Sequence, residues 1–368
     1  MAKEKMKAIV WDGSVYPEGL SYEEVEIPSP PKGWVLVHNR AAGICGADLM
    51  ALRGQTRDKM PDKLFPAVLG HENAGDVVKT GEGVTRVKVG DRVAVEPLHG
   101  CIDFGKSCPM CLSGRYQLCL DGVSHVGMPM KRMLPGGYGE YSIVHENHVY
   151  PMPDSMSYEE GAILDVLAVN VHGAMIGKPQ LGDTVAVVGC GIIGINMIQV
   201  LRSMGITKII AVAKYGHQAQ MAEKYGAAHS IVLDDNEDPV KEVMRLTGGR
   251  GVDQAYECVG GNSNAFSQAV EMAAVGGKII MFGGTASPSM VSLSTILYRE
   301  LSVLASSSYC MAGDKPEFQI AMELVQSGQV DHKGVITHRF RPEDYEKAFE
   351  MIFSKKQNHI CKAVWVRE

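Results

Sequence analysis

The sequence lacks any long apolar run. Its most apolar stretches, around residues 185–189 and 278–284, are far shorter than the roughly 20 residues that a membrane-spanning helix needs. The first residues, MAKEKMKAIVWDG, contain no apolar core after the lysines, so no secretory signal is visible. We therefore expect no membrane partner and a cytoplasmic location.

Blocks of like charge, low-complexity tracts and internal repeats are absent as well. Lys and Arg number 36 against 42 Asp and Glu, and the resulting net charge of −6 disfavours a nucleic-acid partner. The composition, 45% hydrophobic and 21% charged, is typical of a globular protein. A chain of 368 residues is too long for one small core, so we expect two domains.

Cysteine, by contrast, is concentrated. Four of the nine cysteines lie in one short stretch, at Cys101, Cys108, Cys111 and Cys119. Thiols gathered this closely bind a metal or form disulfides, and a reducing compartment favours the metal. The two-residue gap between Cys108 and Cys111 lets both sulfurs reach one tetrahedral ion, with Cys119 as a further ligand. The stretch predicts a zinc site that carries no chemistry of its own.

The first part of the chain is rich in short strands separated by Gly and Pro. Four segments alternate apolar and polar residues and are predicted as strands: 7–11, 34–42, 73–81 and 91–97. Their clustering favours a barrel-like β domain. Residues 157–178 are predicted to form a helix that Ser157 caps.

From residue 183 onward, strands alternate with helices. The predicted strands are 184–189, 208–213, 229–233, 252–260 and 278–284. The predicted helices between them are 192–204, 217–225, 238–247 and 262–274. This rhythm is typical of a doubly wound parallel sheet. Beyond about residue 303 the pattern is irregular, and we expect the C-terminal part to return to the first lobe.

The turn after the strand at 184–188 has the sequence of a dinucleotide-binding loop, Gly189-Cys190-Gly191-Ile192-Ile193-Gly194. In this strand–turn–helix context the glycines permit a tight turn and close approach of a pyrophosphate to a helix N-terminus. No acid follows the strand at 208–213, where one would bind the ribose hydroxyls of NAD. Lys214 and His217 stand there instead, which favours NADP over NAD, although Lys214 as a solvated loop charge is the alternative.

Three further segments carry residues that ligate metals. They contain Cys45, the pair His71 and Glu72, and Asp165. Sulfur, imidazole and carboxylate suit zinc, and a site with three protein ligands leaves a position for water or substrate. Because these residues are far apart in the sequence, a buried cysteine and a core histidine remain the alternative interpretation.

The chain resembles the zinc-dependent medium-chain alcohol and polyol dehydrogenases. The resemblance spans nearly the whole chain in nine segments: GICGADL (43–49), LGHENAGDVV (69–78), VKVGDRVAVEP (88–97), CPMCLSGRYQLC (108–119), GGYGEY (136–141), EEGAILD (159–165), GCGIIG (189–194), GVDQAYECVG (251–260) and GGKIIMFGG (276–284). It implies a GroES-like β-barrel catalytic domain over 1–156, a Rossmann domain over 157–303, and a return to the catalytic domain over 304–368.

The resemblance also implies roles for single residues. Catalytic zinc is expected on Cys45, His71 and Asp165, with Glu72 close enough to approach the metal. Structural zinc is expected on Cys101, Cys108, Cys111 and Cys119. Contacts to NADP or NAD are expected from Gly189, Gly191, Ile192, Ile193, Gly194, Lys214, Val259 and Gly283. The implied reaction moves a hydride between the nicotinamide and a secondary alcohol, polyol, sugar or cyclitol, with ketone reduction in reverse. Family members are usually homodimers or homotetramers.

Two departures from the family pattern stand out. The first structural cysteine usually lies two residues before the second, at Gly105 here, whereas Cys101 lies four residues earlier. Either Cys101 or Asp103 completes that site. In addition, Ala47 and Met50 replace the residues that usually relay the proton of the alcohol, so water, a ribose hydroxyl or a residue such as Glu72 or His172 must take that role.

Two other functions remain open from the sequence. One is a zinc-independent carbonyl reductase, which the ligand set Cys45, His71 and Asp165 disfavours. The other is a dinucleotide-binding structural or sensor protein without catalysis, which the missing relay at Ala47 and Met50 favours.

The substrate cannot be named from the sequence. Six methionines occupy the loops that we expect around the site, and they form either an adaptable pocket or packing in a core or interface: Met50, Met60, Met128, Met130, Met133 and Met311.

Overall fold

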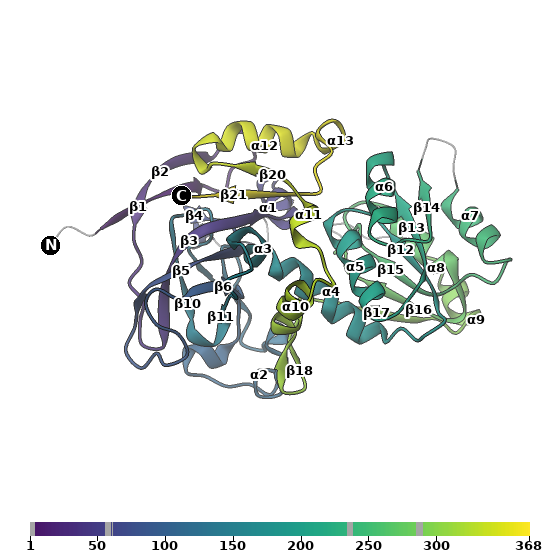
Figure 1. Cartoon of the computed structure of the whole chain (residues 1–368), viewed down its shortest axis with the longest axis horizontal. Helices are drawn as coiled ribbons and strands as arrows, with labels where there is room; N and C mark the ends of the chain where they lie inside the picture. The colour runs from purple at the N-terminus through teal and green to yellow at the C-terminus, as the bar shows by residue number, and fades with distance from the viewer. Residues whose placement is uncertain (1–3, 56–59, 61, 234–237, 285–289) are drawn as a thin grey trace. The chain divides into compact units, whose positions relative to one another are not determined.

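The computed structural model describes residues 4–55, 60, 62–233, 238–284 and 290–368. By internal contacts the chain divides into two units, whose elements are labelled in Figure 1. Unit 1 comprises Met1–Asp165, Cys310–Gln326 and His332–Glu368. Unit 2 comprises Val166–Tyr309 and Ser327–Asp331. The chain thus returns to unit 1 at Cys310, contributes the short segment Ser327–Asp331 to unit 2, and ends the described sequence in unit 1.

Unit 1 is built mainly from antiparallel strands. Its largest sheet has the order β11-β6-β5-β3-β21-β20, and β10 also pairs with β3. These strands are β3 (Trp34–Ile44), β5 (Glu72–Thr80), β6 (Arg92–Val95), β10 (Tyr141–His145), β11 (Val149–Pro151), β20 (Ile336–Phe340) and β21 (Lys362–Val366). Smaller sheets join β1 (Lys5–Trp11) to β2 (Leu20–Glu26) and β4 (Ala67–Val68), β8 (Ser124–Val126) to β7 (Leu98–His99) and β9 (Arg132–Leu134), and β18 (Met311–Ala312) to β19 (Lys315–Pro316).

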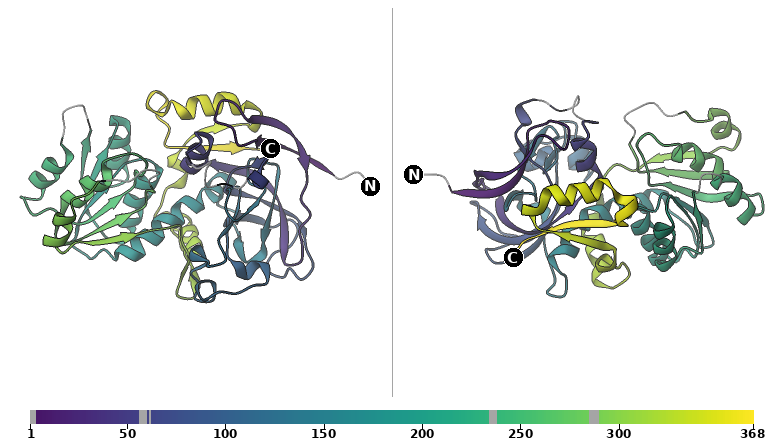
Figure 2. Two further views of the ribbon diagram at one scale, coloured as in Figure 1. Left: turned by 180° about the vertical axis from the view of Figure 1, so that it is seen from behind. Right: turned by 90° about the horizontal axis from the view of Figure 1, so that it is seen from above.

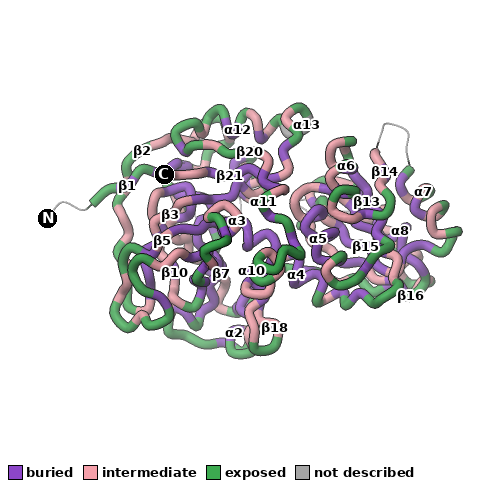
Figure 3. Tube along the Cα trace, viewed as in Figure 1, coloured by how far each residue is buried: buried purple, intermediate pink, exposed green. Residues whose placement is uncertain are grey.

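Two apolar clusters fill unit 1. Branched side chains suit a pleated, half-buried surface, and valines of β3, β5, β6, β10 and β11 pack together in one cluster. In the other, α12 (Tyr345–Phe353) packs on the sheets through aromatic rings, with Phe349 and Trp365 centred 5.7 Å apart. Buried residues accordingly follow the strands of the sheets in Figure 3.

The register of β3 brings distant segments together at one end of the large sheet. Gly43 pairs with Glu72 on β5, and Ile44 pairs with Ala363 on β21, both antiparallel. Continued by one residue, these registers place position 44 opposite 71 and position 45 opposite 362, so residues 45, 71 and 362 lie at the same end of the sheet. This register sets the position of the site described below.

The helices of unit 1 are short. They are α1 (Gly46–Leu52), α2 (Pro109–Leu112), α3 (Tyr158–Ala162), α10 (Glu317–Gln326), α11 (His332–Val335), α12 and α13 (Lys355–Asn358). Short 3-10 turns lie at Asp62–Leu64, Cys101–Phe104, Tyr116–Leu118, Glu146–His148 and Pro342–Asp344. The single helix predicted over 157–178 is wrong in one respect, because Ile163 separates α3 from α4 (Leu164–Gly177). The predicted cap is confirmed: Ser157 Oγ accepts a hydrogen bond from the Glu160 N–H at 3.2 Å.

Unit 2 is a parallel six-stranded sheet in the order β14-β13-β12-β15-β16-β17. Its strands are β12 (Thr184–Val188), β13 (Lys208–Ala213), β14 (His229–Val232), β15 (Val252–Glu257), β16 (Ala273–Met281) and β17 (Ser302–Ala305). The connecting helices are α5 (Ile192–Ser203), α6 (Gly216–Lys224), α7 (Pro239–Leu246), α8 (Ala265–Met272) and α9 (Leu293–Tyr298). Helices cover both faces of the sheet (Figures 1 and 2), and the strand order is the doubly wound one.

The predicted alternation of strands and helices in unit 2 is confirmed, with one error. The helix predicted over 262–274 ends at Met272, and Ala273 already begins β16. The parallel pairing of Val252 with Ala273 extends that strand backward, so a tertiary contact ends the helix earlier than the local sequence indicates. Within the described chain, every helix is too short or too polar to cross a bilayer.

Candidate active site

The four cysteines of the 101–119 stretch meet at one point in unit 1. The Sγ atoms of Cys101, Cys108, Cys111 and Cys119 all lie within 4.8 Å of one another. Cys101 Sγ and Cys111 Sγ are 3.7 Å apart. Four Zn–S bonds of about 2.3 Å in a tetrahedron place the sulfurs about 3.8 Å apart. The donors and their spacing therefore fit a zinc ion.

The longer loop between Cys101 and Cys108 folds back on itself. Residues Cys101–Phe104 form a 3-10 turn that ends at Gly105, whose left-handed φ of 71° reverses the chain. The N–H of Lys106 then donates to the Cys101 carbonyl at 3.1 Å, and the N–H of Cys101 lies 3.3 Å from Cys119 Sγ. The extra residues are absorbed within the turn, so Cys101 still reaches the other thiols.

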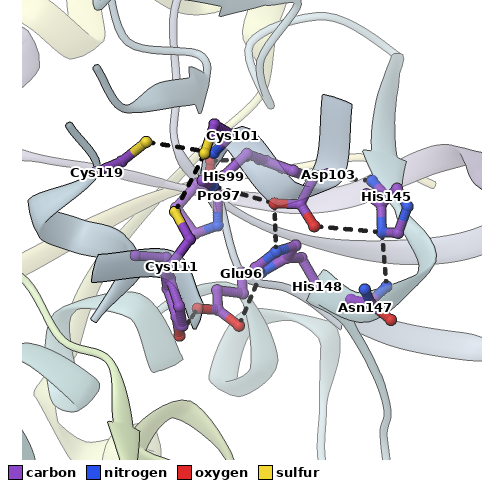
Figure 4. A network of polar contacts seen from close by, with 12 residues as sticks. Glu96, Pro97, His99, Cys101, Asp103, Cys111, Cys119, His145, Asn147 and His148 are labelled. Atoms are coloured by element: carbon purple, nitrogen blue, oxygen red, sulfur yellow. Dashed lines mark hydrogen bonds and ion pairs between the residues drawn. The ribbon is translucent and has the colours of Figure 1, made fainter. Parts of the chain in front are cut away.

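Asp103 belongs to a different group of contacts. Its Oδ2 accepts from the Gly100 N–H at 3.0 Å and lies 3.0 Å from His148 Nε2. The other nitrogen of His148 is 3.2 Å from Glu96 Oε2, so the ring is held between two carboxylates (Figure 4). Burial opposes the charge of His148, but Asp103 and Glu96 raise its pKa to about 10. Of the two residues that the sequence left open, Cys101 lies with the other three thiols, and Asp103 contacts Gly100 and His148 instead.

The second predicted metal group forms where β3 ends. Cys45 follows β3 as the N-cap of α1, and His71 and Glu72 lie at the start of β5. Ligand atoms of these three residues all lie within 4.8 Å of one another. Sulfur, imidazole and carboxylate in this arrangement fit zinc.

Asp48 contacts both Cys45 and His71 and so helps to hold this group in place. Its Oδ2 accepts hydrogen bonds from the Cys45 N–H at 3.0 Å and the Tyr138 hydroxyl at 2.9 Å, and Oδ1 lies 3.4 Å from His71 Nδ1. Burial opposes a charge on His71, but the carboxylate of Asp48 raises the pKa of His71 well above its usual value. A carboxylate on one ring nitrogen orients the other nitrogen toward a metal.

Glu72 forms a buried ion pair with Lys362. The Lys362 Nζ lies 2.6 Å from Oε1 and 2.5 Å from Oε2 of Glu72, and both side chains are 2% exposed or less. The ammonium also donates to the Ile44 carbonyl at 3.1 Å. Burial opposes the charge of Lys362, but Glu72 and Cys45 raise its pKa. Gly43 is required beside this pair, because a Cβ there would lie 1.9 Å from Glu72 Oε2.

Asp165 is not among the described residues whose ligand atoms lie within 4.8 Å of one another around Cys45. It is buried in the first turn of α4. The structure thus brings together three of the four residues expected around the catalytic zinc.

The predicted dinucleotide loop joins β12 to α5 in unit 2. Gly189 has a left-handed φ of 96°, and a Cβ on Gly194 would lie 1.8 Å from the Gly189 carbonyl oxygen. A Cβ on Gly191, the N-cap of α5, would meet no atom within 4 Å, so the space in front of this helix end is open. Ile192 and Ile193 form the first turn of α5. The loop therefore fits a pyrophosphate at the helix N-terminus.

Glu257 fixes the two neighbouring loops at the same edge of the sheet. At the end of β15, its Oε1 accepts from the N–H groups of Val259 and Gly260, both at 2.8 Å. Its Oε2 accepts from the Gly283 N–H at 3.2 Å. Val259 and Gly283 were expected to contact the cofactor, and their place at the carboxyl ends of parallel strands suits that role.

Lys214 lies just beyond the end of β13. Its side chain is exposed, with Nζ 5.5 Å from the centre of the Tyr215 ring, and Tyr215 stacks on His217 at 5.6 Å. An exposed ammonium beside stacked rings offers one positive charge at the edge where an adenosine ribose is expected.

The six loop methionines divide into two sets. Met133 packs against the aromatic cluster of unit 1, and Met311 packs against the four cysteines. Met50, Met60, Met128 and Met130 line a cavity of about 450 Å³ in unit 1. Met60 belongs to both sets, because it also packs against the aromatic cluster. Cavity lining and core packing are thus both found among these methionines.

Three organising residues were missed from the sequence: Asp48, Lys362 and Glu257. Each left a signal. Asp48 stands three residues after a helix N-cap, the position of an acid in a capping box. Lys362 is a charged residue in an otherwise apolar strand, and Glu257 is a buried acid at the end of β15, but nothing in the sequence names their partners.

The thiolate site generates a prediction that separates Cys101 from Asp103. Wild-type protein is expected to hold about two zinc ions per chain. Cys101→Ser is expected to lose about one ion, because three thiolates with a weak fourth donor hold zinc poorly. Asp103→Asn is expected to keep both ions and to lose stability of roughly 1–3 kcal/mol, because it weakens a buried hydrogen-bond network. Metal analysis of the purified variants checks this, and loss of zinc only in Asp103→Asn would contradict it.

The buried ion pair generates a second prediction. Lys362→Met leaves Glu72 buried without a counter-charge, so the free energy of unfolding is expected to fall by about 3–5 kcal/mol. Lys79→Met is the matched control, because Lys79 is exposed on the same sheet, and its effect is expected within about 0.5 kcal/mol. Urea titration measures both. Adding Glu72→Gln to Lys362→Met is expected to restore part of the loss; equal stability of all variants would show that the pair is unimportant.

Comparison with known proteins assigns both parts of the chain. Residues 31–154 match the alcohol dehydrogenase GroES-like domain, and residues 193–327 match the zinc-binding dehydrogenase family. The chain is 32% identical to L-threonine 3-dehydrogenase of Bacillus velezensis over 353 residues, covering 95% of this chain and 96% of that protein. It is also 32% identical to sorbitol dehydrogenase of Bacillus subtilis over 364 residues, covering 99% and 97%.

Solved structures agree over the same length. An Escherichia coli oxidoreductase/dehydrogenase of unknown specificity has a TM-score of 0.88 at 29% identity, with 99% of each chain covered. Two similar structures contain cofactor: an E. coli alcohol dehydrogenase with NADH (TM-score 0.85, 27% identity, 99% of each chain) and a putative zinc-binding dehydrogenase of Sinorhizobium meliloti with NADP (0.84, 27%, 99% and 100%). The expected fold, zinc and nicotinamide cofactor are thereby confirmed, and the chain belongs to the zinc-dependent medium-chain alcohol and polyol dehydrogenases.

Proposed function

We propose that Cys45, His71, Glu72 and Asp165 form the catalytic zinc site of this dehydrogenase, which oxidises a secondary alcohol, polyol, sugar or cyclitol and reduces the ketone in reverse. The observation that supports the proposal most is the meeting of Cys45, His71 and Glu72 within 4.8 Å. Such a ligand set disfavours a zinc-independent reductase and a protein without catalysis, because ligand residues brought together from two strand ends have no role in either.

The side chains around the site have separable tasks. When bound, zinc polarises an alcohol oxygen and the nicotinamide accepts a hydride. Asp48 orients His71, and Lys362 balances the charge of Glu72, so the ligands are held before substrate arrives. Ala47 offers no group to carry the released proton. That proton must leave through water, a cofactor hydroxyl or Glu72, which already lies in a hydrogen-bonded pair.

We also propose that NADP is preferred over NAD. The support is Lys214, exposed at the end of β13 where no acid stands to bind ribose hydroxyls. A charge-assisted contact to a 2′-phosphate would favour NADP by about tenfold in kcat/KM. The assay described next gives this ratio directly, and a ratio near one, unchanged by Lys214→Ala, would contradict the preference.

Turnover of the site variants tests the proposed function. Cys45→Ala and Asp165→Asn are each expected to lower kcat about a thousandfold, because the Lewis acid is lost or misplaced. Both are expected to bind NADPH as the wild type does, since the dinucleotide loop lies in unit 2. Asp154→Asn, at an exposed position, is the matched control. Reduced-cofactor absorbance with a panel of secondary alcohols and polyols gives kcat; full turnover of metal-free Cys45→Ala would contradict the proposal.

Three broader properties are proposed with this function. We place the protein in the cytoplasm, on the basis of its cysteine-rich metal site. We keep the catalytic domain at 1–156, the Rossmann domain at 157–303 and the C-terminal return at 304–368. The contact-based units, which change over between 165 and 166 and between 309 and 310, lie close to these limits.

We further propose that the protein is a homodimer, or a homotetramer built from such dimers, joined through β17. Among the described strands β17 pairs only with β16, so its outer edge is open. Exposed apolar side chains occur on β17 and on α9, the helix that directly precedes it: Leu293 (73%), Leu297 (69%), Tyr298 (83%) and Val303 (41%). An open strand edge beside apolar side chains suits pairing with the same strand of a second copy.

The oligomeric state tests this surface. Val303→Lys is expected to release monomers, because it places a charge on the pairing edge. Val89→Lys, at another exposed valine, is expected to leave the assembly unchanged. Light scattering after size exclusion gives the masses, and a Val303→Lys protein of wild-type mass would contradict pairing through β17.

A further inference from the structure

The cavity lined by Met50, Met60, Met128 and Met130 has two main walls. One is a face of α1 formed by Ala47, Met50 and Ala51, which lie three and four residues apart and so point the same way. The other is the run Met128, Pro129 and Met130, in the loop between β8 and β9. With about 450 Å³, the cavity has the size of a small-molecule site.

The cavity borders the catalytic ligands. Ala47 lies two residues after Cys45, and Leu69, which also lines the cavity, lies two residues before His71. Asp48 belongs to the lining as well, and it contacts both Cys45 and His71. A substrate held with its alcohol oxygen at those ligands would have this space next to its carbinol carbon.

The two polar side chains of the lining, Asp48 and Lys131, already have partners. Asp48 accepts from the Cys45 N–H and the Tyr138 hydroxyl. Lys131 is exposed and pairs with Asp121, with Nζ 2.7 Å from Oδ1. The remaining lining residues described have apolar side chains. Hydroxyl groups entering the cavity would give up water without gaining partners in return.

We propose that this cavity holds a bulky apolar substituent on the carbinol carbon, so that the substrate is a secondary alcohol or ketone with an alkyl or aryl group rather than a polyol. The proposal rests on the proposed function and narrows it. Thioether side chains are flexible and polarizable, so four methionines fit groups of different shape. Ala47 and Met50, where the resemblance places relay groups, are part of this apolar wall.

A substrate series tests the proposal on the zinc-loaded enzyme with NADP and NAD. Methyl carbinols of increasing chain length, from isopropanol to the hexyl member, are compared with methyl phenyl carbinol, sorbitol, threonine and butanediol. We expect kcat/KM to rise about fourfold per added methylene over the first few members. The best apolar member is expected to exceed sorbitol by at least about a hundredfold.

Variants of the cavity lining test whether the preference for apolar substrates arises at this cavity. Met50→Gln and Met130→Gln place an amide of similar shape in the lining, and Met204→Gln is the control. Met130 and Met204 are 38% and 41% exposed, and Met204 does not line the cavity. For Met50→Gln and Met130→Gln, kcat/KM for the hexyl carbinol is expected to fall about tenfold more than that for isopropanol. A general loss of folding would lower both values together.

The outcomes separate this proposal from the proposed function. If kcat/KM does not change with chain length and sorbitol or threonine is the best substrate, the proposal of an apolar substrate is overturned. The proposed dehydrogenase function is then retained. Equal losses for both carbinols in the Met50→Gln and Met130→Gln variants would also overturn it. If no compound is turned over, the proposed function fails, and calorimetric titration of the zinc-loaded protein with hexyl methyl ketone then tests the cavity alone. Binding that Met50→Gln weakens about tenfold supports the cavity, and absence of binding overturns it.

Discussion

The pairing of β3 with β5 on one side and β21 on the other is the constraint on which the catalytic unit depends. Three segments from the beginning, the first third and the end of the chain are joined there by backbone hydrogen bonds. The register sets Cys45, His71 and Lys362 side by side before any side chain is considered. A shift of this register by one residue would turn the side chains of the shifted strand to the opposite face of the sheet and would separate the ligands. Metal chemistry in this protein is thus a consequence of strand register.

The two sulfur-containing sites show opposite ways of supporting a metal. At the four cysteines, all four thiols come from one stretch, and the loop carrying Cys101 absorbs its extra residues in a single turn. Around Cys45, the ligands come from separate strands and depend on Asp48 and Lys362 for orientation and charge balance. A local site tolerates a longer loop, whereas a site built from distant strands depends on the whole sheet.

Periodic and local signals made most of the fold predictable. The alternation of apolar segments gave the strands of unit 2, and Ser157 gave a helix start, because these features depend on neighbours in sequence. The break at Ile163 was not predicted. The early end of α8 was not predictable, since tertiary pairing of Ala273 decides it. The cysteine stretch was recognisable from spacing, but Cys45, His71 and Glu72 needed the resemblance, because spacing carries no information across separate strands. Lys362 shows the limit most clearly: its charge was visible, but its partner lies 290 residues away.

The position of β21 has a consequence for how the protein is made. Lys362 is synthesised 290 residues after Glu72, and also after the four cysteines of the 101–119 stretch. Until β21 is synthesised, β3 has an open edge and the Glu72 carboxylate has no cation beside it. The part of unit 1 that is made first therefore cannot reach its final structure before β21 is present. Completion of unit 1 is delayed until β21 has been made, by which time all of unit 2 has been made.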